Sequence, residues 1–161
     1  MNTLLHTCCA PCSIYCVDSL RQEGIQPTSY WFNPNIHPYT EYRSRKTTLE
    51  EYAKSIQLPL IIDNTYGLRS FVRAVIDDLE HRCFYCYQVR LEQTARYAAE
   101  HHFDSFSTTL LVSPYQKHDA LIAAGEAAAR QYNVPFLYRD FRVGFHQGQE
   151  QAKTLDLYRQ K

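Results

Sequence analysis

The chain has 161 residues, of which 45% are hydrophobic, so it is long enough for one domain with a buried core. Its 17 basic residues balance its 17 acidic residues, which excludes a protein that binds nucleic acids or membranes through its overall charge. No window approaches the roughly 20 consecutive apolar residues of a membrane span, and the first residues lack the basic region of a secretory signal. We therefore expect one domain over residues 1–161, located in the cytoplasm.

Short hydrophobic stretches alternate with helix-like patterns along the whole chain. The expected strands are residues 2–7, 28–34, 58–63, 103–111 and 134–141. The expected helices are residues 12–24, 39–57, 68–80, 86–102 and 118–132. This alternation predicts an α/β fold, a single doubly wound, Rossmann-like domain with a mostly parallel sheet of about five strands. Such sheets bind ligands at the carboxyl ends of their strands.

A cluster of cysteines follows the first expected strand. Four of the six cysteines lie within residues 8–16, and Cys9-Ala-Pro-Cys12 stands between that strand and the next helix. A second pair of the same spacing is Cys83-Phe-Tyr-Cys86. Clustered cysteines in a reducing cytoplasm are more often metal ligands or redox catalysts than structural disulfides.

The number of cysteines favours one kind of metal site. The two pairs supply four thiolates for zinc or for an iron–sulfur cluster, and Cys8 adds a fifth. A structural zinc site closes with four ligands, so the surplus favours iron–sulfur or redox chemistry. Cys12 is expected in the first turn of a helix, where free backbone N–H groups stabilise a thiolate. Cys16 lies one turn later and is expected to be a small buried hydrophobic residue.

Two other interpretations stay open at this point. The proline between Cys9 and Cys12 is also typical of thioredoxin-like enzymes, which use one dithiol. A thiol–disulfide oxidoreductase would leave Cys8 and the second pair without a role. A zinc-binding module without catalysis is the third interpretation.

Three polar stretches elsewhere carry candidate binding residues. They are residues 31–46, with Asn33, Asn35, His37, Glu41, Tyr42 and Arg45; residues 107–118, with Thr108, Thr109, Ser113, Tyr115, Gln116 and His118; and residues 140–148, with Asp140, Arg142 and two glycines in a loop. The first could grip a polar ligand, and the second suits phosphate or ribose contacts. Capping and turn formation explain several of these residues equally well.

Five sequence blocks together resemble one family. "LLHTCCAPCS", "FNPNIHPYTEYRSR", "RCFYCYQVRL", "STTLLVSPYQKH" and "DFRVGF" resemble successive blocks of the QueH-type epoxyqueuosine reductases and cover nearly the whole chain. The resemblance implies an enzyme that reduces epoxyqueuosine to queuosine at the wobble base of tRNA. It also implies a [4Fe-4S] cluster with an additional mononuclear iron, in place of cobalamin.

The resemblance also assigns metal ligands. Cys8, Cys9, Cys83 and Cys86 match the family's metal-binding cysteines. Cys12 matches a position where some relatives carry aspartate, and since both residue types bind iron, Cys12 joins the expected ligands.

The expected chemistry needs electrons, protons and an RNA surface. The catalytic candidates are Cys8 and Cys12 at the metal, with His6, His37, Tyr115 and Asp140 as possible proton donors. The expected partners are the anticodon loop of a queuosine-family tRNA and a reductant that the sequence does not identify. Tyr39 or Tyr42 is expected to stack on a base. The expected phosphate contacts are Arg43, Arg45, Lys46, Arg69, Arg73 and Arg90.

Overall fold

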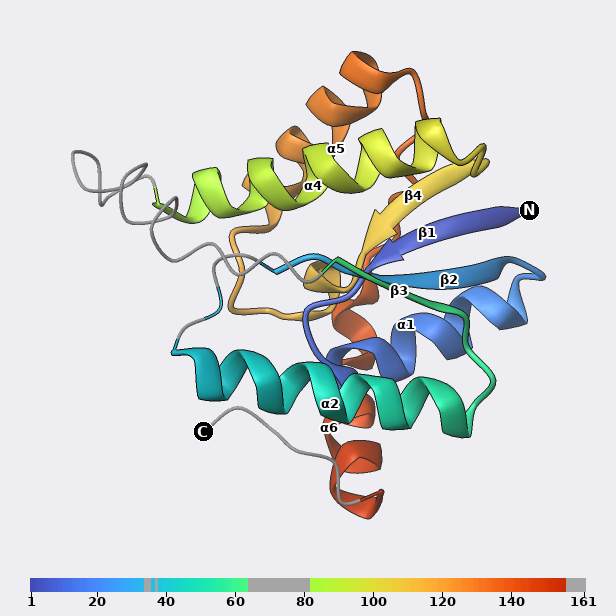
Figure 1. Cartoon of the computed structure of the whole chain (residues 1–161), viewed down its shortest axis with the longest axis vertical. Helices are drawn as coiled ribbons and strands as arrows, with labels where there is room; N and C mark the ends of the chain where they lie inside the picture. Colours follow the sequence, from blue (N-terminus) through green and yellow to red (C-terminus); the bar gives the residue numbers. More distant parts are fainter. Residues whose placement is uncertain (34–35, 37, 64–81, 156–161) are drawn as a thin grey trace.

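The computed structural model of the chain describes residues 1–33, 36, 38–63 and 82–155, with the backbone alone at 82–85 (Figure 1). The described strands are β1 (Asn2–His6), β2 (Gln26–Trp31), β3 (Leu60–Ile62) and β4 (Ser105–Thr108). The described helices are α1 (Ala10–Gln22), α2 (Tyr39–Ser55), α4 (Arg82–Glu100), α5 (His118–Tyr132) and α6 (Phe145–Thr154), with short 3-10 turns η2 (Thr109–Val112) and η3 (Phe141–Gly144).

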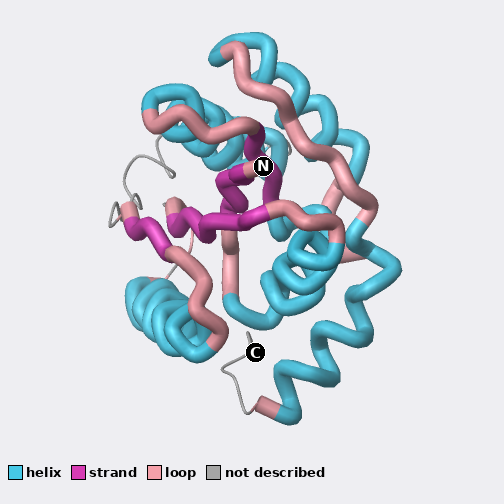
Figure 2. Tube along the Cα trace, turned by 90° about the vertical axis from the view of Figure 1, so that its right-hand side faces the viewer, coloured by secondary structure: helices cyan, strands magenta, loops and turns pink. Residues whose placement is uncertain are grey.

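The strands form one parallel sheet in the order β3-β2-β1-β4. Helices α4 and α5 cover one face, and α1, α2 and α6 cover the other (Figures 1 and 2). The central strand β1 is buried from Thr3 to His6, as a strand covered on both faces must be. The predicted α/β class and parallel sheet are confirmed.

The predicted fifth strand is a difference between sequence and structure. Within residues 134–141 the structure has one isolated parallel bridge, between Phe106 and Phe136. It consists of hydrogen bonds from Phe106 N–H to Pro135 O (3.1 Å) and from Leu137 N–H to Phe106 O (2.8 Å). Its partner β4 ends at Thr108, because the chain turns there into η2. The described part of the sheet therefore has four strands and a bridge at its β4 edge.

Most helices lie close to their predicted positions, with changes at their ends. Helix α1 begins at Ala10, two residues before the predicted start, and Pro11 suits its first turn. Helix α4 begins at Arg82, so the second cysteine pair lies in its first turns. The predicted helix at 68–80 lies outside the described residues.

The loop predicted for residues 140–148 is wrong, because this stretch forms η3 and the start of α6. Of the two glycines that suggested a loop, Gly144 at the end of η3 allows a close approach to α1, whereas Gly148 in α6 has room for a side chain. A Cβ at Gly144 would collide with the ring of Tyr15, and one at Gly148 would lie 3.5 Å from Pro11 O. No helix among the described residues is long and apolar enough to cross a membrane.

Candidate metal centre

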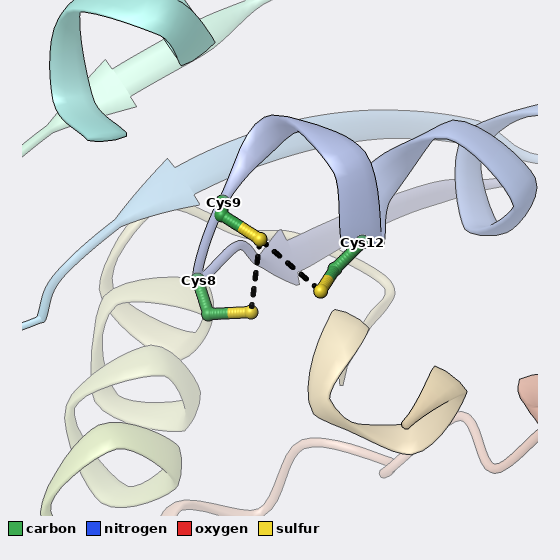
Figure 3. Close-up of side chains that lie close together, drawn as sticks. All are labelled: Cys8, Cys9 and Cys12. Atoms are coloured by element: carbon green, nitrogen blue, oxygen red, sulfur yellow. Dashed lines mark hydrogen bonds between the residues drawn. The ribbon is translucent and has the colours of Figure 1, made fainter. Parts of the chain in front are cut away.

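Three cysteine side chains converge at the carboxyl end of β1, just before and within the first turn of α1 (Figure 3). The Sγ atoms of Cys8, Cys9 and Cys12 all lie within 4.8 Å of one another. The Cys9 and Cys12 sulfurs are 3.1 Å apart, and those of Cys8 and Cys9 are 3.9 Å apart. The structure thus brings together three of the five predicted ligands, at the edge where a doubly wound sheet binds its ligands. Cys16, by contrast, is fully buried, as predicted.

The three thiols differ in acidity. Hydrogen bonding with Cys12 and Cys9 holds the pKa of the Cys8 thiol well below its usual value, with Thr109 and Arg90 acting in the same direction. Hydrogen bonding with Cys8 and Cys9, together with burial, raises the pKa of Cys12. The bond with Cys12 lowers the pKa of Cys9, but the bond with Cys8 and burial together raise it. These contacts lower the pKa of Cys8 and raise those of Cys9 and Cys12, whereas the helix position suggested a lowered pKa for Cys12.

A buried arginine, Arg90, interacts electrostatically with both Cys8 of this cluster and Cys86 of the second cysteine pair. Burial lowers the pKa of the Arg90 guanidinium, while its electrostatic interactions with Cys8 and Cys86 act in the opposite direction. Arg90 is 7% exposed, so it is not the surface phosphate contact predicted from the sequence. Cys86 is half-buried, and the backbone places Cys83 one turn before it in α4. The position of the Cys83 side chain is not described, so its place in the cluster stays a prediction.

The hydroxyl of Thr109, which directly follows β4, contacts both the backbone and the sulfur of Cys8. The Cys8 N–H donates to Thr109 Oγ1 over 3.2 Å, and the same oxygen lies 3.4 Å from Cys8 Sγ. Thr109 and Thr108 are fully buried, so neither is available for the phosphate or ribose contacts predicted from the sequence. The sequence offered no signal for the contact between Thr109 and Cys8, since it depends on the pairing of β1 with β4.

Next to the thiols, His6 joins the ends of three strands. Its Nε2 lies 3.2 Å from Phe32 O and 3.1 Å from Asn33 Oδ1, and its Nδ1 lies 2.9 Å from Thr108 Oγ1. Asn33 Nδ2 donates to Thr7 O over 3.0 Å. Burial, with Arg90 nearby, lowers the pKa of His6 to about 4, so the ring is neutral at pH 7. Asn33, predicted to bind a ligand, is part of this buried frame.

Of the predicted proton donors, His6 is buried and neutral at pH 7, whereas Tyr115 and Asp140 are exposed. His37, like Asn35, is outside the described residues. Tyr115 is 83% exposed, and its ring makes an edge-to-face contact with Phe145, with ring centroids 5.7 Å apart. The hydrogen bonds from Arg142 lower the pKa of Asp140 to about 2, so this exposed carboxylate is ionised at neutral pH and has no proton to give.

The predicted RNA contacts on α2 divide into buried and exposed residues. Tyr42 is 2% exposed and accepts a hydrogen bond from Trp31 Nε1 (3.2 Å), so an outside base cannot stack on it. Tyr39 is 55% exposed and stacks on Tyr42 with ring centroids 6.0 Å apart. Arg45 forms an ion pair with Glu41 at 2.8 Å, and Arg43 is exposed. Arg69 and Arg73 lie outside the described residues.

The loop before α5 is fixed to α4. The Tyr87 hydroxyl donates to Gln116 Oε1 over 2.6 Å and accepts from Lys117 N–H over 3.1 Å. Tyr115 is therefore held on an anchored loop while its own ring faces solvent.

The chain is similar to known proteins over almost all of its length. The family model described as "Epoxyqueuosine reductase QueH" matches residues 3–161. The protein of that name from Dehalococcoides mccartyi is 37% identical over 158 residues, which cover 98% of this chain and 87% of the relative. The one from Thermotoga maritima is 32% identical, over 99% of this chain and 85% of the relative. The one from Haemophilus influenzae is 36% identical, but this chain spans only 58% of its length.

One solved structure supports the fold alone. A protein from Methanocaldococcus jannaschii, described as a predicted subunit of a tRNA methyltransferase, superposes with a TM-score of 0.64 at 16% identity. The match covers 95% of this chain and 76% of that one.

Proposed function

Because the chain belongs to the QueH family of epoxyqueuosine reductases, which are oxidoreductases, we propose that it reduces the epoxide of epoxyqueuosine at the wobble position of tRNA. The observation that carries the proposal is the group of three converging thiols at the carboxyl end of β1. The product is queuosine, in which a cyclopentene replaces the epoxide-bearing ring.

The reaction defines what the site must supply. Conversion of an epoxide to an alkene consumes two electrons and two protons, breaks both C–O bonds, forms the C=C π bond and releases the oxygen as water. When bound, a [4Fe-4S] cluster supplies single electrons, and an iron with an open position acts as a Lewis acid on the epoxide oxygen. The electrons come ultimately from an external reductant.

The donor set fits such a group. Cys8, Cys9, Cys83 and Cys86 are the proposed ligands of the cluster, and Cys12 is the further ligand for the cluster or the additional iron. Thiolate sulfur is the ligand class that iron–sulfur clusters require. Three of these sulfurs already lie within 4.8 Å of one another, and Cys86 interacts with the same buried guanidinium as Cys8. Arg90 supports the proposal because a positive charge offsets the negative charge of assembled thiolates.

We propose that the RNA contacts exposed side chains near the carboxyl ends of the strands. Tyr39 and Tyr115 offer aromatic rings to bases, and Arg43 offers a cation to phosphate. His37 and Tyr115 are the proposed proton donors. Asp140 is assigned to holding Arg142 in place, because the ion pair keeps the carboxylate ionised.

A second candidate function has one observation in its favour. The Cys9 and Cys12 sulfurs lie 3.1 Å apart, close enough for a thiol–disulfide oxidoreductase to use them as its dithiol. That function assigns no role to Cys86, whereas the proposed reductase uses it as a metal ligand. Cys86→Ala therefore separates the two: it abolishes iron binding and epoxide reduction in a reductase, and it spares disulfide exchange in a dithiol enzyme.

The deciding experiment uses protein purified without oxygen. We expect a brown sample with about four or five irons per chain, together with sulfide, and conversion of epoxyqueuosine to queuosine in tRNA. The measurements are the visible spectrum, the iron and sulfide content, and nucleoside analysis of the treated tRNA. A colourless protein that keeps zinc after anaerobic incubation with iron and sulfide would overturn the assignment.

A further inference from the structure

The hydroxyl of Thr109 lies against Cys8, although the two residues are 101 positions apart in the chain. Its oxygen is 3.2 Å from the Cys8 amide nitrogen and 3.4 Å from the Cys8 sulfur. Thr109 is fully buried, and Cys8 is 7% exposed. Water therefore does not compete for this contact.

The direction of the contact follows from hydrogen-bonding capacity. A threonine hydroxyl has one proton to donate and two lone pairs to accept with. The Cys8 N–H is a donor and uses a lone pair of the Thr109 oxygen. A metal-bound cysteine is a thiolate without a proton, so the hydroxyl proton of Thr109 is the one available to the Cys8 sulfur.

The turn that carries Thr109 is held by a group of hydrogen-bonded side chains, His6, Asn33 and Thr108, which we call the His6 frame. Asn33 Nδ2 donates to Thr7 O, which directs Asn33 Oδ1 toward His6. Because His6 Nε2 faces two oxygen acceptors, it carries the ring proton, and His6 Nδ1 accepts from the Thr108 hydroxyl. Thr108 Oγ1 in turn accepts from Leu110 N–H over 3.1 Å. The backbone on both sides of Thr109 is therefore held in place.

We propose that Thr109 is a positioning residue whose hydroxyl donates a hydrogen bond to the Cys8 sulfur, orients that ligand and makes the bound iron–sulfur group easier to reduce. This inference rests on the proposed function, in which Cys8 is a ligand of that group. Hydrogen bonds to the sulfurs tune the potential of iron–sulfur groups, and partners behind the ligands orient them. A donor stabilises the more negative, reduced state, so its removal lowers the reduction potential.

Three variants test the hydroxyl. Thr109→Val keeps the shape of the side chain and removes its hydrogen bonds, and Thr109→Ser keeps the hydroxyl. Thr3→Val is the matched control, because Thr3 is also fully buried and its hydroxyl bonds to Ser105 Oγ at 2.7 Å, at the other end of β1 and β4. If Thr109→Val does not fold, Thr109→Ala takes its place with the same expectations.

Two readouts decide the proposal. The first is the Zn²⁺ affinity of the metal-free protein, measured by competition with a chelator, where we expect Thr109→Val to weaken binding about tenfold. The second is a redox titration of the loaded protein followed by electron paramagnetic resonance, where we expect a lower potential in Thr109→Val. Thr109→Ser and Thr3→Val should match the wild type in both.

The outcomes separate this inference from the proposed function. If the wild-type protein assembles no cluster, the proposed function fails, and the Zn²⁺ affinities alone decide the role of Thr109. Wild-type affinity and potential in Thr109→Val would overturn the positioning role. Equal defects in Thr109→Ser and Thr109→Val would also overturn it, because packing and not the hydroxyl would then be responsible.

Discussion

Two groups of polar side chains, one fully buried and one partly buried, lie on either side of Thr7 and have opposite properties. In the His6 frame, formed by His6, Asn33 and Thr108, each side-chain nitrogen and oxygen has a hydrogen-bond partner, and the histidine ring is neutral at pH 7. The thiol cluster, formed by Cys8, Cys9 and Cys12, holds three sulfurs within 4.8 Å of one another. A fully paired neutral network stabilises a fold, whereas crowded thiols are stabilised when a metal replaces their protons.

The two groups show that the end of one strand can carry both side chains that fix the fold and side chains that can bind a metal. The frame fixes the ends of β1, β2 and β4, while the cluster presents ionisable sulfurs at the start of α1. Changes in the frame should therefore alter folding first, and changes in the cluster should alter metal binding first.

The largest expected effect is at the cluster. Cys8→Ala should remove both iron and turnover, because the variant lacks one of the three converging thiols that are the proposed metal ligands. Iron analysis and the tRNA assay measure the two losses. Cys16→Ala is the matched control, since Cys16 is a buried cysteine of α1 outside the group of three and should keep its iron. Full activity in an iron-depleted Cys8→Ala protein would contradict the metal assignment.

The next effect concerns the frame and its pH dependence in the metal-free protein. His6 has a pKa of about 4 when folded and 6.5 when unfolded, so the unfolded chain binds more protons in between. The stability that the folded protein gains from holding a neutral His6 is fully present above pH 6.5 and is lost as the pH falls toward 4. This shift amounts to about 3 kcal/mol in the free energy of unfolding.

Urea unfolding at several pH values measures this effect. His6→Gln should lack the part of the slope that His6 supplies, and its profile should be flatter between pH 6.5 and 4 than that of the wild type. His146→Gln is the control, because His146 is exposed on α6, and it should keep the wild-type slope. An unchanged slope in His6→Gln would show that the ring does not stay neutral in the fold.

A smaller effect is expected where α6 supports the helix that carries the thiols. Gly144→Ala places a methyl group against the ring of Tyr15 in α1 and should cost about 2 kcal/mol of stability through overpacking. Gly148→Ala is its matched control, since its Cβ has room at 3.5 Å from Pro11 O. Thermal unfolding of both variants checks the difference, and equal stability would mean that α6 moves away from α1 at little cost.

The features that could be predicted from the sequence are those set by residues close together in the chain. The position of Cys9 and Cys12 at the start of a helix was predictable, because a hydrophobic strand precedes them and Pro11 suits a first turn. The contact of Thr109 with Cys8 was not, because it depends on strand pairing between distant segments.

Other differences also have physical reasons. The burial of Arg90 could not be predicted from the sequence, because an arginine in a polar helix normally lies on the solvent-exposed face. Helix α6 was mistaken for a loop because glycines often mark turns, whereas here Gly144 leaves room for the Tyr15 ring and Gly148 lies inside the helix. The convergence of Cys83 with the other ligands stays a prediction.

The smallest expected effect lies outside both groups, at Tyr115. Its ring is 83% exposed on a loop anchored through Tyr87, so Tyr115→Ala should leave stability within about 0.5 kcal/mol of the wild type. If the ring stacks on a base, Tyr115→Ala should weaken tRNA binding about fivefold to tenfold, while Tyr115→Phe should keep both affinity and turnover. If the hydroxyl is the proton donor, Tyr115→Phe should lose turnover and keep its affinity. Binding and single-turnover measurements on this pair therefore decide which end of the tyrosine acts, and wild-type behaviour of both variants would remove Tyr115 from the substrate site.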